Sequence, residues 1–109
     1  MASWSLTSYI RGSIDIDWLE VPTAVTDKVT EYQNTDPKKI IHYEQKDSAD
    51  SLKRYYKVGF KDIDTSHEFE ALSEVLAALN NRDTFCNNAD NKMTFEQDRG
   101  LDIEPTIPA

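Results

Sequence analysis

The chain has few of the residues that many kinds of functional site require. It contains one cysteine, three glycines and two histidines among 109 residues. A single cysteine cannot form a disulfide within the chain, and three separated glycines do not make a glycine-rich loop that binds phosphate. No apolar run is long enough for a transmembrane helix, and no basic segment followed by an apolar one opens the chain. We therefore expect a soluble, cytoplasmic protein that makes no membrane contact.

The residues that most often carry catalysis or hold metal ions are isolated from one another. Cys86 follows the predicted end of a helix, where the negative end of the helix dipole raises the pKa of a thiol. His42 falls in a predicted strand and His67 in the first turn of a predicted helix, at no spacing typical of a zinc site. The sequence therefore predicts a protein that is not an enzyme and that has no cofactor, no metal ion and no catalytic residue.

Side chains alternate in character along the start of the chain. Apolar or small residues occupy the even positions, among them Trp4, Leu6 and Ile10. This period of two is typical of a strand with one buried face. A three-residue hairpin loop at Gly12, which would pair Trp4 with Trp18, is an alternative. We expect a single, kinked or bulged strand, because "SLTSYIRGSIDID" and the later "SLKRYYKVGFKDID" form a faint internal repeat.

Periodic patterns place the other elements along the chain. They predict a helix at residues 21–34, followed by strands at 39–45 and 51–63. A longer helix at 64–82 and a last strand at 92–97 complete the chain. The resulting order, β-α-β-β-α-β, is that of the ferredoxin-like split βαβ sandwich. In this α+β fold two helices cover one face of a four-stranded antiparallel sheet. A chain of this length forms one domain, which we place at residues 1–100, and residues 101–109 are expected to form an extended C-terminal tail.

The longer helix is expected to bury one side against the sheet. Thr65 followed by Glu68 predicts a capping box near its start, and apolar residues at helical spacing predict a buried stripe. The apolar even positions of the first strand would pack against that stripe. The predicted core therefore consists of Trp4, Leu6, Ile10, Val58, Phe60, Phe69, Leu72 and Leu76.

The sequence is acidic, but not uniformly so. It has 20 acidic and 12 basic side chains, for a formal net charge of −8. Residues 38–61 hold seven basic and three acidic side chains, whereas residues 62–109 hold three basic and eleven acidic ones. Such an asymmetry concerns the attraction of partners and not the fold. The sequence therefore offers a partner one basic and one acidic surface.

The basic surface involves the first and third strands, which are central neighbours in this fold. Their outward side chains form a predicted set that we name the tyrosine-lysine face: Tyr9, Arg11, Lys53, Tyr55 and Lys57. Tyrosines surrounded by cations can stack on bases and bind phosphates. Single-stranded nucleic-acid binding on this face is therefore one predicted function, and a homodimer formed through the open sheet is an alternative use of it.

The third strand also resembles the corresponding strand of the RNA recognition motif. The stretch "KRYYKVGF" matches that family's pattern at Lys53, Tyr55, Val58 and Phe60. It departs from the pattern at Arg54, Tyr56 and Lys57. The last departure removes the second stacking aromatic. The resemblance covers this strand and Tyr9, and it implies a ferredoxin-like fold whose sheet stacks on bases.

The acidic surface lies on the second predicted helix, at Glu68, Glu70 and Glu74. Carboxylates spaced along a surface can bind the lysine and arginine side chains of a basic protein. The main functional prediction is therefore a small, acidic, non-enzymatic binding protein, which acts as an interaction module or as an inhibitor- or immunity-type partner of another protein. Single-stranded nucleic-acid binding is the alternative function.

Overall fold

The computed structural model describes residues 1–108 and contains a four-stranded antiparallel sheet with the strand order β2-β3-β1-β4. The strands are β1 (Ser3–Arg11), β2 (Ile40–Asp47), β3 (Lys53–Phe60) and β4 (Met93–Leu101). Together with the helices they follow the order β-α-β-β-α-β, with β1 and β3 at the centre of the sheet. The predicted ferredoxin-like α+β fold is confirmed.

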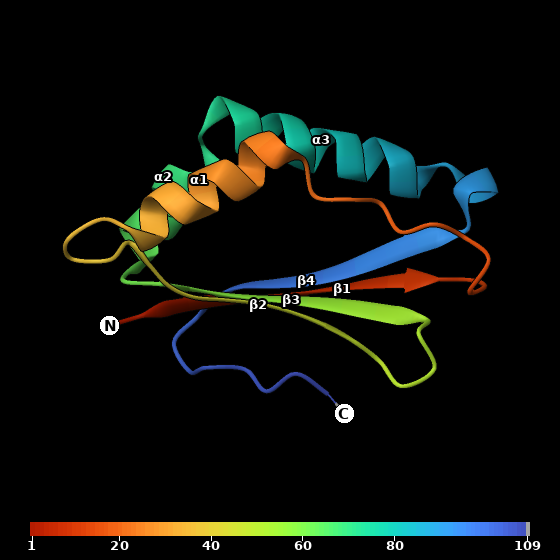
Figure 1. The fold of residues 1–109 in the computed structure, drawn as a ribbon, viewed down its shortest axis with the longest axis horizontal. Helices are drawn as coiled ribbons and strands as arrows, with labels where there is room; N and C mark the ends of the chain where they lie inside the picture. The colour runs from red at the N-terminus through yellow and green to blue at the C-terminus, as the bar shows by residue number, and fades with distance from the viewer. Residues whose placement is uncertain (109) are drawn as a thin grey trace.

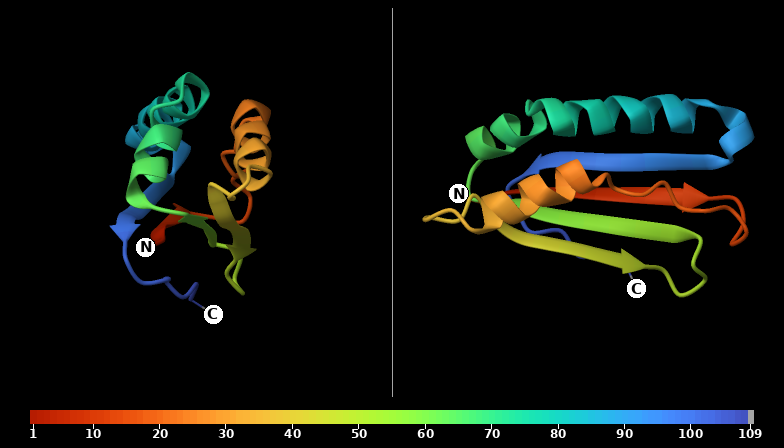
Figure 2. Two further views of the ribbon diagram at one scale, coloured as in Figure 1. Left: turned by 90° about the vertical axis from the view of Figure 1, so that its left-hand side faces the viewer. Right: turned by 45° about the horizontal axis from the view of Figure 1, so that its top comes forward.

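The helices all lie on one face of the sheet (Figure 1). They are α1 (Thr23–Gln33), α2 (Ile63–Glu70) and α3 (Ser73–Asn87), and a short 3₁₀ turn, η1 (Ala89–Asn91), precedes β4. α1 packs over β2, and α3 packs over β4. The two helical columns stand side by side above the sheet in the left view of Figure 2. The central strands therefore pass beneath the space between them.

The first strand is single, as predicted. β1 runs without a turn to Arg11, and the backbone N–H of Gly12 donates a hydrogen bond to the carbonyl of Lys92 at 3.0 Å. This bond connects the end of β1 to the residue before β4. The alternative hairpin at Gly12 is not formed.

The long second helix of the prediction is two helices in the structure. Asp62, not Thr65, caps the first of them, because its carboxylate accepts a hydrogen bond from the Thr65 N–H at 2.8 Å. The chain leaves the helical path between α2 and α3, and this break changes which residues face the sheet. Val75 is buried whereas Leu76 is 48% exposed, so the prediction of Leu76 as a core residue is wrong. α3 also continues to Asn87, past the predicted helix end.

The register of β1 against β3 decides which side chains lie beneath the helices. Leu6 is paired with Lys57, and Thr7 with Tyr56. Residues directly opposite in a sheet point to the same side. Thr7 and Tyr56 both line a cavity between the sheet and the helices, so Leu6 and Lys57 point to the other side. The prediction that the even positions of β1 face the helices is therefore wrong for Trp4, Leu6 and Ile10.

Trp4 is buried on the helix-free side because β3 offers it a flat surface. Its ring lies over Gly59, where a Cβ atom would come within 2.6 Å of a ring carbon. The ammonium of Lys57 lies 5.4 Å from the ring centroid, and the His42 ring lies 5.8 Å away. The sheet therefore has an apolar and aromatic layer on both sides, and β1 contributes its largest apolar side chains to the layer away from the helices.

The main core lies between the sheet and the helices. Phe69 is at its centre, with ring centroids 5.2 Å from Tyr32 and 5.6 Å from Phe60. The buried residues of this core are Val25, Val29, Tyr32, Ile40, Phe60, Phe69 and Val75, with Val58, Leu72 and Leu79 packed against them. The predicted core positions Val58, Phe60, Phe69 and Leu72 are therefore confirmed.

Residues 102–108 form no helix or strand, and this C-terminal tail crosses the face of the sheet that the helices leave free (Figure 1). The carboxylate of Glu104 lies 2.6 Å from the ammonium of Lys57, and Pro108 lies near Lys53 and Tyr55. Tyr55 and Lys57 are each only 6% exposed. The face predicted to be open is therefore partly covered by the protein's own tail.

Substitution of Gly59 tests the packing of Trp4. Gly59→Ala should lower the free energy of unfolding by about 1–3 kcal/mol, because the new methyl group overlaps the indole ring. Gly12→Ala is the matched control, since a Cβ there meets its nearest neighbour, the Lys92 carbonyl oxygen, at an ordinary 3.6 Å. Urea unfolding measures both. Equal stability of Gly59→Ala and the wild type would contradict this packing. In a Trp4→Ala background, Gly59→Ala should cause no such loss of stability, because the ring that the methyl group overlaps is absent.

Candidate functional site: a cavity between sheet and helices

The tyrosine-lysine face predicted from the sequence does not exist as one surface. Tyr9 is paired with Arg54 and lines the cavity beneath the helices. Lys53, Tyr55 and Lys57 point to the opposite side, where they are paired with Ile10, Ser8 and Leu6. The structure therefore divides the predicted site between the two faces of the sheet. The cause is the position of β1, whose odd residues face the helices.

Arg11, the remaining member of that set, stabilises the loop after β1. Its guanidinium donates hydrogen bonds to the carbonyls of Ser51 at 2.9 Å and Ile16 at 2.7 Å. It also lies 4.3 Å from the ring centroid of Trp18, and the guanidinium of Arg54 lies 5.0 Å from the same ring. These contacts hold residues 13–18 against the strand ends, so Arg11 has a clear structural role.

The three glutamates of the predicted acidic surface have cationic partners within the chain. Glu68 accepts a hydrogen bond from the Tyr32 hydroxyl at 3.0 Å and lies 3.3 Å from Lys39. The other two pairs are Glu70 with Arg99 at 3.0 Å and Glu74 with Lys28 at 3.5 Å. Each pair lowers the charge that this surface offers to a partner. Binding of a basic protein here stays a prediction.

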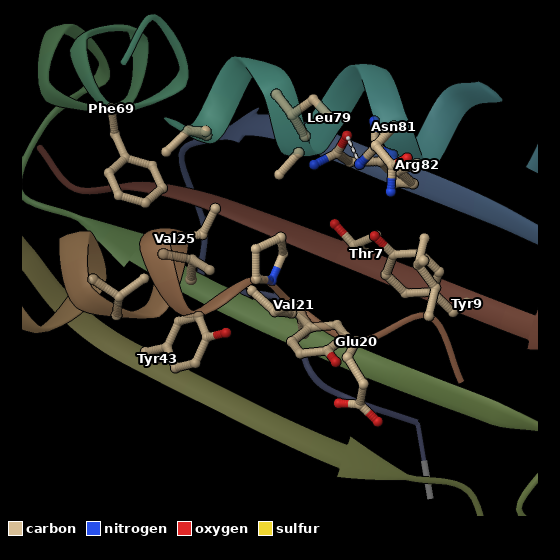
Figure 3. Close-up of a pocket in the computed structure, with 18 residues that line it drawn as sticks. Thr7, Tyr9, Glu20, Val21, Val25, Tyr43, Phe69, Leu79, Asn81 and Arg82 are labelled. Carbon is tan, nitrogen blue, oxygen red and sulfur yellow. Dashed lines mark hydrogen bonds between the residues drawn. The ribbon is translucent and has the colours of Figure 1, made fainter. Parts of the chain in front are cut away.

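A cavity of about 150 Å³ lies between the sheet and the helices (Figure 3). Its walls come from β1, β2, β3, β4, the segment before α1, and the helices α1, α2 and α3. The residues that determine its character are Thr7, Tyr9, Val21, Val25, Tyr43, Tyr56, Val58, Phe69, Leu79, Asn81, Arg82 and Gln97. A space of this volume holds one benzene-sized ring.

The two ends of the cavity differ in polarity. Phe69 and Val25 lie at one end, whereas Thr7, Tyr9 and Arg82 lie at the other (Figure 3). The apolar end adjoins the main core. β1 contributes Thr7 beneath the helices where a larger apolar residue would fill the space. The cavity therefore suits a molecule that has one apolar and one polar end.

Arg82 is the charged group at the polar end, and it is only 6% exposed. Its Nη1 donates a hydrogen bond to Gln97 at 3.1 Å, while Nε and Nη2 both donate to one carboxylate oxygen of Asp83 at 3.2 Å. The guanidinium also lies 4.0 Å from the ring centroid of Phe95. Arginine stays protonated in proteins. The chain therefore holds a buried positive charge beside the cavity.

Three tyrosines line the same cavity and keep their protons. Burial raises the pKa of Tyr43 to about 12. Burial also raises the pKa of Tyr9 and Tyr56 above the ordinary value, although the guanidinium beside each ring, Arg82 or Arg54, opposes part of that shift. The rings of Tyr9 and Tyr56 meet edge to face at 5.7 Å. Near neutral pH these residues therefore offer neutral hydroxyl groups.

Other candidate groups lie outside the cavity wall. Cys86 is in the last turn of α3, not beyond the helix as predicted, and burial raises the pKa of its thiol. Within residues 1–108 no three histidine, cysteine, aspartate or glutamate side chains lie close enough together to hold a metal ion. None of the helices described is both long and apolar enough to cross a membrane.

The spacing of three residues in α3 is a sequence signal for this site that the predicted helix did not use. Val75, Leu79 and Arg82 are separated by four and three residues, so they occupy one side of α3. The predicted stripe instead consisted of Phe69, Leu72, Leu76 and Leu79, because the break between α2 and α3 was not predicted. A correct helix start at Ser73 would have placed Arg82 among the buried positions.

Comparison with known proteins shows likeness in fold only. No protein-family profile matches the chain, and no curated protein is similar to it in sequence. Rv0793 of Mycobacterium tuberculosis is 11% identical, with 93% of this chain and 97% of that chain covered and a TM-score of 0.49. SO0527 of Shewanella oneidensis is 11% identical over 89% and 87% of the two chains, with a TM-score of 0.43.

A third similar structure is a formyltetrahydrofolate deformylase from Pseudomonas putida KT2440. It is 18% identical, with 88% of this chain but 28% of that chain covered, and a TM-score of 0.36. At these identities and TM-scores the likeness carries no inference about function. A functional site is therefore inferred from the cavity alone.

Alkaline unfolding tests the burial of the tyrosine hydroxyls. The pKa of Tyr43 is about 12 in the folded protein and about 10 in the unfolded chain. Its contribution to stability is therefore fully present below about pH 10 and is lost as the pH rises through 12. The melting temperature should fall across this range, and Tyr43→Phe should make the fall shallower. If the melting temperature of Tyr43→Phe followed the same pH profile as that of the wild type, the Tyr43 hydroxyl would not be buried.

Proposed function

We propose that the protein binds a small, largely apolar organic molecule in the cavity between its sheet and its helices. The observation that supports this function best is the cavity's composition, with apolar walls and a few polar groups that converge at one end. Such a combination is typical of small-molecule sites. The proposal keeps the predicted class of a small binding protein and replaces a macromolecular partner with a small one.

A ligand has a route into this cavity. Glu20 is part of the wall, and its side chain is 81% exposed, so the cavity reaches the surface beside it. The wall there is the irregular segment between β1 and α1, which includes Leu19 and Val21. Entry therefore does not require the sheet or the helices to separate.

The expected affinity follows from the size of the cavity. A ring-sized ligand loses its apolar hydration shell on entry, and this burial contributes about 25 cal/mol for each Å² removed from water. Its loss of translational and rotational freedom opposes binding. A dissociation constant on the order of 0.1 mM is the expected result for a neutral ring of this size.

The two functions predicted from the sequence remain predictions. Single-stranded nucleic-acid binding requires a free sheet face, but the tail lies over Tyr55 and Lys57. Binding of a basic protein requires free carboxylates, but Glu68, Glu70 and Glu74 are paired within the chain. These contacts favour the cavity over both surfaces as the functional site.

A cavity-filling substitution on α3 tests the proposal. Ala78 lines the cavity, whereas its neighbour Ala77 is exposed, so Ala78→Leu and Ala77→Leu form a matched pair. Fluorobenzene binding, followed by ¹⁹F NMR, should weaken by about tenfold or more in Ala78→Leu, because the new side chain occupies the space of the ring. Ala77→Leu should bind like the wild type.

The melting temperature of each variant controls for loss of structure. Binding by a folded Ala78→Leu variant that equals wild-type binding would show that the probe does not occupy this cavity. Absence of binding to the wild-type protein would contradict the proposed function directly.

A further inference from the structure

The polarity of the cavity identifies the class of ligand more closely, and this step rests on the proposed function. We infer that the ligand is a small organic anion, an apolar ring or short branched chain carrying a carboxylate, whose oxygens accept hydrogen bonds from Arg82. The carboxylate would lie at the polar end with Thr7 and Tyr9, and the apolar part would point toward Phe69 (Figure 3).

Arg82 has an incomplete set of partners for a buried cation. A guanidinium carries five N–H groups, and three of those of Arg82 donate hydrogen bonds to Gln97 and Asp83. The guanidinium is also hydrogen-bonded to the hydroxyl of Tyr9, which lines the cavity. One N–H group therefore has no partner among residues 1–108 and can donate to a ligand oxygen.

The one carboxylate beside Arg82 neutralises it poorly. Asp83 uses a single oxygen for both of its hydrogen bonds, at 3.2 Å, instead of the two-oxygen arrangement that arginine and carboxylate prefer. Its side chain is 51% exposed, so water screens the pair. A buried charge that is only partly compensated is unfavourable. A carboxylate within the cavity would supply the missing compensation.

The other polar groups of the cavity favour the same ligand. Within the described chain, neither the Thr7 nor the Tyr9 hydroxyl donates a hydrogen bond to a side chain or backbone acceptor, so both protons are available to an acceptor. Apart from Arg82, the wall contains one residue with a full charge, Glu20. Its carboxylate is at the exposed rim, 3.9 Å from the guanidinium of Arg54, which also pairs with Asp47 at 2.8 Å. Beyond this rim, Arg82 is the one charged group of the cavity wall that an entering anion meets.

Three probes of similar shape separate charge from size: benzoate, benzyl alcohol and benzylamine, each titrated at neutral pH by NMR. Benzoate should bind wild-type protein at least about tenfold more tightly than benzyl alcohol, the difference expected for a hydrogen bond between charged groups. Benzylamine should bind most weakly. Arg82→Met should reduce the preference for benzoate to less than about twofold while benzyl alcohol binds as before, and Arg82→Lys should keep part of it.

The outcomes distinguish this inference from the proposed function. Benzyl alcohol binding that equals or exceeds benzoate binding would overturn the anion inference and leave the small-molecule function standing. Failure of all three probes to bind would overturn both. Benzoate binding that persists in the Ala78→Leu variant would place the anion on the surface and also overturn the inference. The wild-type comparison decides the question even if Arg82→Met does not fold.

Discussion

The pairing of β1 with β3 is the constraint on which the rest of the structure depends. It places Thr7 opposite Tyr56, and both beneath the helices, while Leu6 and Lys57 share the other face. In a strand a shift of one residue exchanges the two faces completely. The cavity exists because β1 turns its small and polar side chains toward the helices. Trp4 and the other large apolar side chains of β1 lie instead on the face where Glu104 of the tail pairs with Lys57.

The fold was predictable because its signals are local. Alternation in the strands, helical spacing in α1 and the order of the elements all survive in the structure. Alternation could not predict which side of β1 faces the helices. The pattern identifies the apolar side of the strand, but it does not show whether the helices or another segment cover that side. The layer that covers the apolar side depends on two distant residues. Gly59 leaves room for the Trp4 ring, and Glu104, which is 47 positions from Lys57 in the sequence, pairs with it.

The candidate site was hidden for a related reason. Arg82 is buried on the side of α3 that also carries Val75 and Leu79, and α3 begins anew after the break that follows α2. Tyr43 and Tyr56 come from strands whose sequences resemble any partly exposed strand. Their common position around one cavity follows from long-range pairing, which a single sequence does not reveal. Burial then gives these groups their chemistry, with neutral tyrosines near a cation that is only 6% exposed.

Aromatic contacts in a nuclear Overhauser spectrum test this arrangement most directly. Ring protons of Tyr9 should show cross-peaks to Tyr56 and Phe95, whose ring centroids lie 5.7 Å and 6.2 Å from that of Tyr9. Trp4 should show cross-peaks to His42, at 5.8 Å. Cross-peaks from Trp4 to Phe69, or from Tyr9 to Tyr55, would place β1 the other way round and contradict both the cavity and the covered sheet face.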